Sequence, residues 1–576
     1  MNLGAWHVAA GQAQRWVGTS AAAMVVGWPV KYLHVIVPTV LAVAFGMHFI
    51  HSAYGTQDDD GYIFYQYARN LATGYGLSFN PGEVSFGVTS GGWVLLLTCV
   101  HVLLRSDIIM EAQYLGLGLY ALSVGVWAQA TARWSGYAGV GLLAATLYTL
   151  ELDAMKYSLH GLETGLSLAL FAIVAYLLVD GWLERPMAMG IAVGLVTLTR
   201  PDNAVVLLPV LLAGLSSRRP LRAVLRKLAA FGVVALAIIA PWYGWVWAST
   251  GSPMPPTQTG KLLVFLPLHF GITLHDLLGM SLMEHAAFAL RVLLDFASEG
   301  GATRVAIASW VLLVMLGTVL WARPGTRRYS VWIWLLVGCL LAQLALYAWA
   351  FPLLKLRYLI NLLPVGLAVG VAAVGLLAKQ DGGKLLARAH SIMTRVVGVS
   401  GGTGPRARPA LRAAGYWALI ALVLAGALAY AQEMKRQVNN YRYYVSAQDV
   451  RREVGVWLRE HTPGDSLVAL EPIGAIGFYS GRRVLDLGGL IDPGVWPFLS
   501  GGYSDGQAIA RLLRERHADY LVDYTYPQGI GGVSAALPSL PGSARLVTIE
   551  SALVMSGSRA EYGSYTIYAV HALHTR

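Results

Sequence analysis

Residues 33–60 read LHVIVPTVLAVAFGMHFIHSAYGTQDDD, an apolar segment followed by three consecutive acids, Asp58, Asp59 and Asp60. An α-helix needs about 20 predominantly apolar residues to cross roughly 30 Å of hydrocarbon. A cluster of charges beside such a segment usually marks chemistry. The stretch therefore predicts a first membrane span with a functional acidic loop directly after it.

The composition extends this prediction to most of the chain. Hydrophobic residues make up 56% of the sequence, charged residues only 13%, and the mean hydropathy is +0.55. A soluble enzyme of this length rarely has such a composition. Cys99 and Cys339 lie inside distant apolar runs, which excludes a disulfide framework and a cysteine-rich metal site. The sequence predicts a polytopic α-helical membrane protein.

The net charge of +11 is concentrated in three short loops, residues 218–227, 323–328 and 379–412. Loops rich in Lys and Arg stay on the cytoplasmic side of a membrane. The basic charge therefore indicates topology, and we expect no nucleic-acid partner.

Placing these loops inside the cell orients about eleven spans, if the short apolar segment Trp93 to Leu104 is an interfacial or re-entrant helix. The N-terminal stretch is expected to be a cytoplasmic lead-in to the first span. The predicted spans are residues 33–52, 112–132, 137–157, 164–181, 187–200, 202–216, 228–248, 304–322, 330–350, 356–378 and 413–432.

Two regions are expected outside the plasma membrane. Residues 53–111 form a first external loop within a transmembrane catalytic domain, residues 1–432. Residues 433–576 have more charges, prolines and short β-rich runs, which predicts a small external α/β domain that could bind the acceptor. Its expected strands are Ser466 to Leu470, Arg483 to Leu487 and Tyr520 to Tyr524, and its expected helices are 448–460 and 506–516.

Polar residues recur at the outer ends of the predicted spans. Carboxylates can deprotonate a hydroxyl or hold a divalent ion, and Arg, Lys and His can neutralise a phosphate. The external loops contain no glycine-rich loop for a nucleotide, so a lipid-linked donor is expected and a nucleotide cofactor is not. The residues in question are Asp58, Asp59, Asp60, His160, Glu163, Arg200, Asp202, Lys261, Arg357 and Tyr358.

The sequence contains the motifs Asp59-Asp60-Gly61-Tyr62-Ile63, Tyr67-Ala68-Arg69-Asn70-Leu71, Gly74-Tyr75-Gly76-Leu77, Phe79-Asn80-Pro81-Gly82-Glu83, Thr89-Ser90, Gly161-Leu162-Glu163-Thr164, Leu198-Thr199-Arg200-Pro201-Asp202, Gly251-Ser252-Pro253-Met254-Pro255, Arg357-Tyr358 and Asp486-Leu487-Gly488-Gly489-Leu490-Ile491-Asp492-Pro493. Together they resemble the motifs of GT-C glycosyltransferases, and within that class they are most similar to those of the actinobacterial arabinofuranosyltransferases that add terminal β-(1→2) arabinofuranose. The sequence departs from the pattern at Gly61, where alanine is usual, and at Gly87-Val88, where Gly-Tyr usually precedes the Thr-Ser.

The resemblance implies transfer of a sugar, D-arabinofuranose, from decaprenyl phosphate to a hydroxyl of a cell-wall glycan, either arabinogalactan or lipoarabinomannan. It implies that Asp59 and Asp60 are the catalytic carboxylates, with one of them as general base. The alternative is that these acids only cap the helix that follows. Asp58 is expected to be a bystander.

The remaining polar residues each have two interpretations. Glu163 could bind metal, orient the acceptor or start a helix, and His160 could bind substrate or be an ordinary interfacial polar group. Arg200 and Asp202 could contact the donor phosphate or form a local pair at the Pro201 helix break.

Lys261 and Arg357 are expected to bind the donor phosphate, although both could snorkel to the interface. Tyr358 could contact substrate but suits the aromatic belt of the membrane. Asp59, Asp60 and Glu163 together could hold Mg²⁺, Mn²⁺ or Ca²⁺.

Three other functions remain open. A GT-C enzyme for mannose, galactose or an aminosugar would share the acids and differ in its donor pocket. A transporter or flippase would place ionisable groups near the bilayer midplane and often shows inverted repeats, which we do not see. A scaffold or receptor would not need acids and cations from separate loops.

Overall fold

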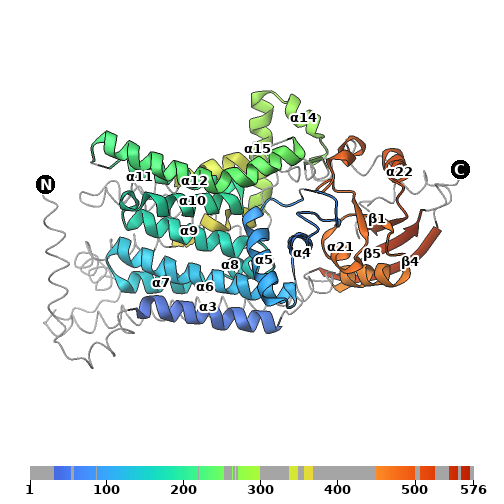
Figure 1. Ribbon diagram of the computed structural model, residues 1–576, viewed down its shortest axis with the longest axis horizontal. Helices are drawn as coiled ribbons and strands as arrows, with labels where there is room; N and C mark the ends of the chain where they lie inside the picture. The colour runs from blue at the N-terminus through green and yellow to red at the C-terminus, as the bar shows by residue number, and fades with distance from the viewer. Residues whose placement is uncertain are drawn as a thin grey trace, which may run out of the picture.

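The computed structural model describes residues 32–52, 57–85, 87–217, 219–251, 262–263, 266, 270–298, 337–347, 356–362, 364–367, 371, 449–499, 506–525, 544–555 and 559–570. It shows a bundle of apolar helices at one end and a domain with a β-sheet at the other (Figure 1). Between them lies α4 (Asp59–Ala72), the helix that begins in the acid triplet.

Three described helices are long and apolar enough to cross a membrane: α3 (Leu33–Ser52), α6 (Ile108–Ser135) and α12 (Leu221–Thr250). A fourth span results if α7 (Ala138–Thr149) and α8 (Leu152–Leu159), which meet at 60°, are counted as one. The predicted number of eleven is not confirmed, because spans 304–322 and 413–432 lie outside the described residues, as do parts of 330–350 and 356–378.

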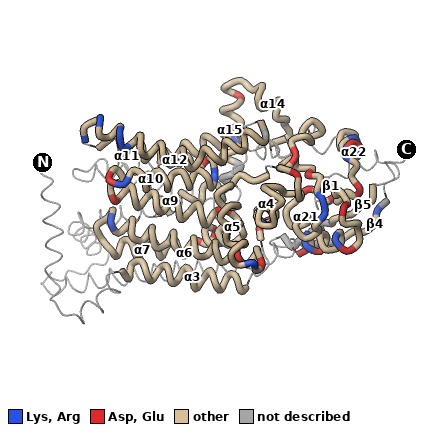
Figure 2. The backbone as a smooth tube through the Cα atoms, in the orientation of Figure 1, with Lys and Arg blue, Asp and Glu red and all other residues tan. Residues whose placement is uncertain are grey.

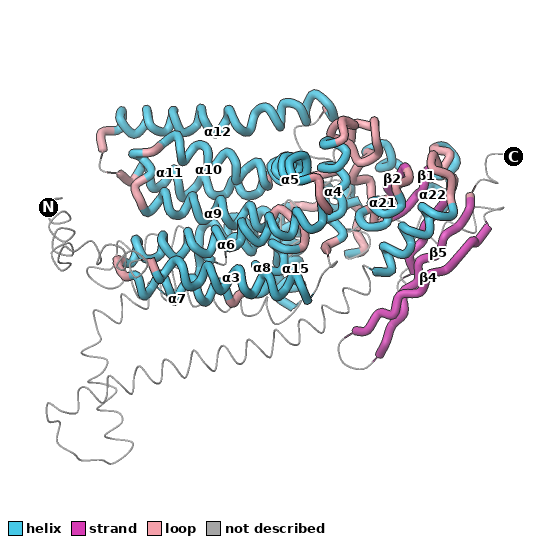
Figure 3. Tube along the Cα trace, turned by 60° about the horizontal axis from the view of Figure 1, so that its bottom comes forward, coloured by secondary structure: helices cyan, strands magenta, loops and turns pink. Residues whose placement is uncertain are grey.

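Shorter helices fill the bundle, among them α9 (Thr164–Val179), α10 (Pro186–Thr199) and α11 (Leu207–Leu215). The long helix α6 packs against α3, α7 and α9, while α10 packs against α9 and α12. The helix α5 (Gly91–Leu104) is seen nearly end-on in Figure 3, where its neighbours run lengthwise. It therefore lies across the bundle, as expected for a segment that does not span.

The charged residues differ between the two ends of the bundle. Lys and Arg gather at the end farthest from the sheet domain (Figure 2). There Arg133 and Arg185 form ion pairs with Asp180, and Lys227 lies 3.3 Å from Glu184. The predicted inner residues Arg133 and Lys227 thus share one end of the bundle, and the acid triplet lies at the other.

The C-terminal domain is a five-stranded sheet with strand order β2-β1-β3-β5-β4. The first three strands run parallel, and β5 pairs antiparallel with both β3 and β4. The strands are β1 (Leu467–Leu470), β2 (Arg483–Asp486), β3 (Tyr520–Thr525), β4 (Ala544–Met555) and β5 (Arg559–Ala569), and the helices are 449–461, α21 (Gly474–Ser480) and α22 (Gly506–Glu515).

The three predicted strands and both predicted helices are confirmed, whereas α21 and the β4–β5 hairpin were not predicted. Alternate residues of the first strands enter two different cores, as the pleat of a strand requires. Ala469 packs with α22, while Val468 and Leu470 belong to the same apolar cluster as Tyr62 and Tyr65 of α4. One core therefore continues from the sheet into the membrane domain.

Candidate functional site

The acid triplet forms the N-terminus of α4. Asp58 is its N-cap, and its carboxylate accepts a hydrogen bond of 3.2 Å from the Asp60 backbone N–H. Carboxylates in this position satisfy free amide groups and the positive end of the helix dipole. The helix-capping role, predicted from the sequence as the alternative for Asp59 and Asp60, thus belongs to Asp58.

The Asp59 side chain points to the C-terminal domain. Its two carboxylate oxygens accept hydrogen bonds of 3.0 Å each from the backbone N–H groups of Gly474 and Ala475, which begin α21. Arg451 lies 3.2 Å from the same carboxylate. Burial raises the pKa of Asp59, while Arg451 and the Ala475 N–H act in the opposite direction. Asp59 therefore joins α4 to the C-terminal domain.

Asp60 lies in the same first turn and is half-buried. Besides Arg451, charges from both domains act on the triplet, with Lys156 of α8 within electrostatic range of Asp58 and Glu471 of the C-terminal domain within range of Asp60. Lys156 also forms an ion pair of 2.8 Å with Asp153. Neither Lys156 nor Asp153 was predicted, although two charges within an otherwise apolar segment were a visible signal.

The start of α4 rests on the loop that contains His160 and Glu163. The Asp58 N–H lies 3.4 Å from the His160 carbonyl oxygen, and the indole N–H of Trp93 donates to the Gly161 carbonyl at 2.9 Å. A Cβ at Gly61 would lie 2.6 Å from the His160 carbonyl oxygen. This approach explains why the sequence has glycine where the GT-C motif usually has alanine.

His160 is buried directly after α8. Burial first, and Lys156 second, hold the pKa of its imidazole well below the ordinary range. A neutral imidazole lacks the charge that would neutralise a phosphate.

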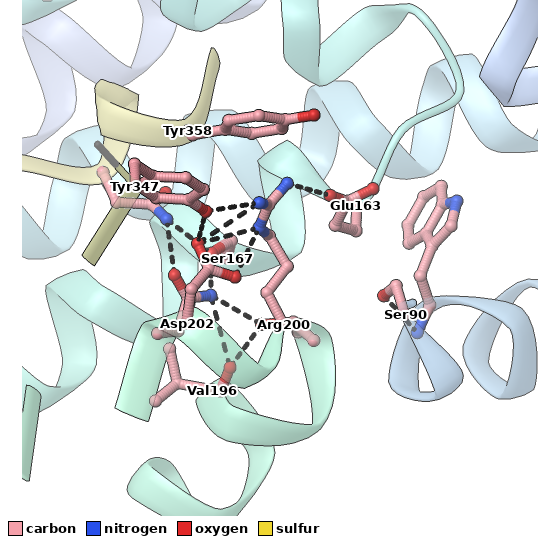
Figure 4. A network of polar contacts seen from close by, with 12 residues as sticks. Ser90, Glu163, Ser167, Val196, Arg200, Asp202, Tyr347 and Tyr358 are labelled. Atoms are coloured by element: carbon pink, nitrogen blue, oxygen red, sulfur yellow. Dashed lines mark hydrogen bonds and ion pairs between the residues drawn. The ribbon is translucent and has the colours of Figure 1, made fainter. Parts of the chain in front are cut away.

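Arg200 is the centre of a buried polar network at the same end of the bundle (Figure 4). Its guanidinium contacts the Glu163 carboxylate at 3.0 Å and the Asp202 carboxylate at 3.0 and 3.2 Å. It also donates to the Tyr347 hydroxyl at 2.9 Å, and that hydroxyl donates to Asp202. The network has two carboxylates against one guanidinium, so its charge does not favour a phosphate.

The two tyrosines of the network come from a distant part of the chain. The Tyr347 ring stacks on the Tyr358 ring with a centroid distance of 5.1 Å and an interplanar angle of 10°. The Arg200 guanidinium carbon lies 4.5 Å from the centre of the Tyr358 ring, which suits a cation–π contact. Tyr358 is 5% exposed and therefore belongs to the network rather than to an outer aromatic belt.

A layer of amides supports the network. Asn203 donates to Ser167 of α9 at 2.8 Å, and Asn361 donates to Ser167 at 2.9 Å and to Asn203 at 3.0 Å. These bonds tie α9, the turn after Arg200 and the segment around Tyr358 together. The side chains at Glu163 and Arg200 are consequently held from three segments.

The remaining predicted ligands are not placed. Lys261 and the side chain of Arg357 lie outside the described residues, and the backbone of Arg357 belongs to α18 (Leu356–Leu359). Among the described residues no group of three His, Cys, Asp or Glu side chains could hold a metal ion. Asp59, Asp60 and Glu163 are described and form no such group, since Asp59 is held by Gly474, Ala475 and Arg451.

Comparisons with known proteins find one matching domain model and several similar solved structures. A model described as "Domain of unknown function (DUF8728)" matches residues 439–568. No curated protein sequence matches the chain.

Two structures of the oligosaccharyltransferase AglB from Archaeoglobus fulgidus are similar to the chain, each at 13% identity. One, tethered to an acceptor peptide, has a TM-score of 0.51 over 89% of this chain and 72% of that one. The other, with an inhibitory peptide and a dolichol-phosphate, has a TM-score of 0.50 over 87% and 74%. ArnT from Cupriavidus metallidurans bound to undecaprenyl phosphate has 15% identity and a TM-score of 0.48 over 96% of this chain and 99% of that one.

The similarity to AglB is one of architecture, and it covers both the helical bundle and the C-terminal domain. The chain shares the fold of these oligosaccharyltransferase structures.

Proposed function

We propose that this protein is a membrane glycosyltransferase that moves a sugar from a polyprenyl phosphate to a hydroxyl of a glycan. The observation that carries the proposal is the meeting, at one end of an apolar bundle, of the acid triplet, the His160–Glu163 loop and the Arg200 network. A buried site at a membrane surface suits a donor whose lipid part remains in the bilayer.

In the proposed reaction an acceptor hydroxyl attacks the anomeric carbon of the donor. The new C–O bond forms as the bond from that carbon to the phosphate oxygen breaks, and the polyprenyl phosphate leaves with the bonding electrons. A carboxylate takes the proton of the hydroxyl. We assign this base to Asp60, which lies half-buried in the first turn of α4 and within electrostatic range of Glu471 of the C-terminal domain.

The more specific part of the proposal is D-arabinofuranose as the sugar, decaprenyl phosphate as the carrier and a cell-wall glycan as the acceptor. It is supported by the resemblance of the motifs around Asp59, Glu163 and Arg200 to the arabinofuranosyltransferases. The basic residues gathered at the far end of the bundle support a plasma-membrane protein whose acids and C-terminal domain lie outside.

The test is transfer of radiolabelled arabinofuranose from decaprenyl phosphate to a synthetic arabinan by the purified protein. We expect Asp60→Asn to lower kcat by about 10²- to 10⁴-fold, as loss of a general base does, without changing the melting temperature. The exposed Asp465 provides the control variant Asp465→Asn, which should be as active as the wild type.

Each other result has a defined meaning. Transfer of mannose, galactose or an aminosugar instead would retain the GT-C transferase and exclude arabinose. Full activity of Asp60→Asn would exclude Asp60 as the base. A folded wild type that transfers none of these sugars would overturn the proposed function.

A further inference from the structure

The C-terminal domain contributes a carboxylate to the surroundings of the acid triplet. Strand β1 ends at Leu470, and Glu471 begins the connection from β1 to α21. The first N–H groups of α21 hold Asp59 of α4. This contact fixes the β1–α21 connection, and Glu471 with it, beside the first turn of α4.

Four charged side chains surround Glu471. They are Arg451 of helix 449–461, Asp486 at the end of β2, and Asp59 and Asp60 of α4. Asp59 and Asp486 already accept backbone hydrogen bonds, those of Asp486 coming from the N–H groups of Gly488, Leu490 and Ile491. Glu471 is half-buried, and within the described part of the chain no hydrogen bond holds its carboxylate.

The carboxyl of Glu471 changes its protonation state near neutral pH. Burial raises the pKa of its carboxyl to about 7; Arg451 opposes this shift, and Asp486, Asp59 and Asp60 add to it. An ionised carboxylate accepts hydrogen bonds from hydroxyl groups and donates none. A carboxylate next to the base of a glycosyltransferase is thus suited to the hydroxyl groups of the acceptor sugar.

We infer that Glu471 binds the acceptor, with the reacting hydroxyl at Asp60 and a neighbouring hydroxyl of the same sugar donating to Glu471. This inference rests on the proposed function and assigns half of the acceptor site to each domain. In this arrangement the C-terminal domain lines one side of the active site. Glu471 then determines which acceptors bind, according to the positions of their hydroxyl groups.

The first test is the kinetics of Glu471→Gln, with the exposed Glu460→Gln of helix 449–461 as the matched control. We expect the KM for a synthetic arabinofuranose oligosaccharide to rise about 10-fold, the value of one charge-assisted hydrogen bond. The KM for the lipid donor should stay unchanged. In the wild type, acceptor affinity should improve as pH rises through about 7 and Glu471 ionises, and Glu471→Gln should lack this step.

Binding of the acceptor without donor, followed by saturation-transfer NMR, makes the test independent of turnover. A wild type that binds arabinose or mannose oligosaccharides but transfers no sugar would overturn the proposed function, while weaker binding by Glu471→Gln would still support the acceptor site. If Glu471→Gln misfolds, Glu471→Asp keeps the charge on a shorter arm and should show the same selective loss. Unchanged acceptor binding in a folded variant, or a change in donor KM alone, overturns the inference, and a wild type that binds no oligosaccharide overturns both proposals.

Discussion

The three acids at the start of α4 differ in their surroundings. Asp58 caps the helix, Asp59 is held by the amides of α21, and Asp60 lies half-buried within electrostatic range of Glu471. Adjacent residues on a helix point in different directions, since each is turned by about 100° from the last. Three chemically identical side chains in a row therefore have three different surroundings.

Arg200 provides a test at the scale of one residue. Its guanidinium is 14% exposed and contacts Glu163 and Asp202, which are 8% and 13% exposed. Removing one partner of a buried ion pair leaves the other charge uncompensated and costs about 3–5 kcal/mol. We expect Arg200→Met to lower the free energy of unfolding by this amount in thermal melts of the detergent-solubilised protein.

The control for Arg200 is Arg185→Met at the other end of the bundle. Arg185 is 60% exposed in its ion pair with Asp180, so its loss should cost less than about 1 kcal/mol. Equal melting temperatures for the two variants would show that the Arg200 network contributes nothing to stability.

The local part of this network could be predicted from the sequence. Arg200 and Asp202 flank Pro201, and the predicted pair between them is confirmed. The partnership with Tyr347 could not be predicted, because 147 positions separate it from Arg200 and an isolated tyrosine near a span end is usually an interfacial anchor. The role of Asp59 was also beyond prediction, since its partners lie 415 and 416 positions away.

At the scale of elements, the contact between α4 and the His160 loop depends on Gly61. A methyl group at this position would lie 2.6 Å from the His160 carbonyl oxygen, so the backbone of α4 or of the loop would have to move. Overpacking of this kind costs about 1–3 kcal/mol. We expect Gly61→Ala to lower the melting temperature and to reduce sugar transfer, because the acids move with α4.

Gly118 of α6 is the matched control, since a Cβ there meets nothing within 4 Å. Alanine in a helix interior is favoured over glycine by roughly 0.5–1 kcal/mol, so Gly118→Ala should be neutral or slightly stabilising. A Gly61→Ala protein that melts and reacts like the wild type would contradict the close packing of α4 on this loop.

Some of the short elements could be predicted from the sequence and others could not. The strands of the parallel part have compact apolar runs such as LVAL, and both amphipathic helices have a clear period. The helix α21 reads GAIGFYS, whose two glycines and short length disfavour a helix. Tertiary contacts with α4, among them the Tyr62–Phe478 ring pair at 5.5 Å, supply the missing stability.

At the scale of the whole molecule, stability should depend on pH through the carboxyls at the domain junction. Burial raises the pKa of Glu471 to about 7 and that of Asp486 to about 6. In the unfolded chain such groups titrate near 4, so between about pH 4 and 7 the folded state binds more protons. Stability from these groups is therefore greatest in acid and is lost as the pH rises to 7.

Thermal melts between pH 4.5 and 8 check this prediction. Glu471→Gln cannot ionise, so the variant should lose less stability than the wild type over this range. The exposed control Glu460→Gln should follow the wild type. If the melting temperatures of the wild type and Glu471→Gln change by the same amount with pH, the Glu471 carboxyl has the same pKa in the folded and the unfolded protein, which contradicts the prediction.

The junction between the domains also sets an order of events during synthesis. The amides that hold Asp59 lie 415 residues further along the chain. At about 5–20 residues per second, roughly 20–80 s pass between the emergence of the acid and that of its partner. The helix α4 is thus among the first segments to be made and among the last to be completed by its contacts. A chain that stops before its last quarter lacks the amides that hold Asp59, so this junction forms only in the finished protein.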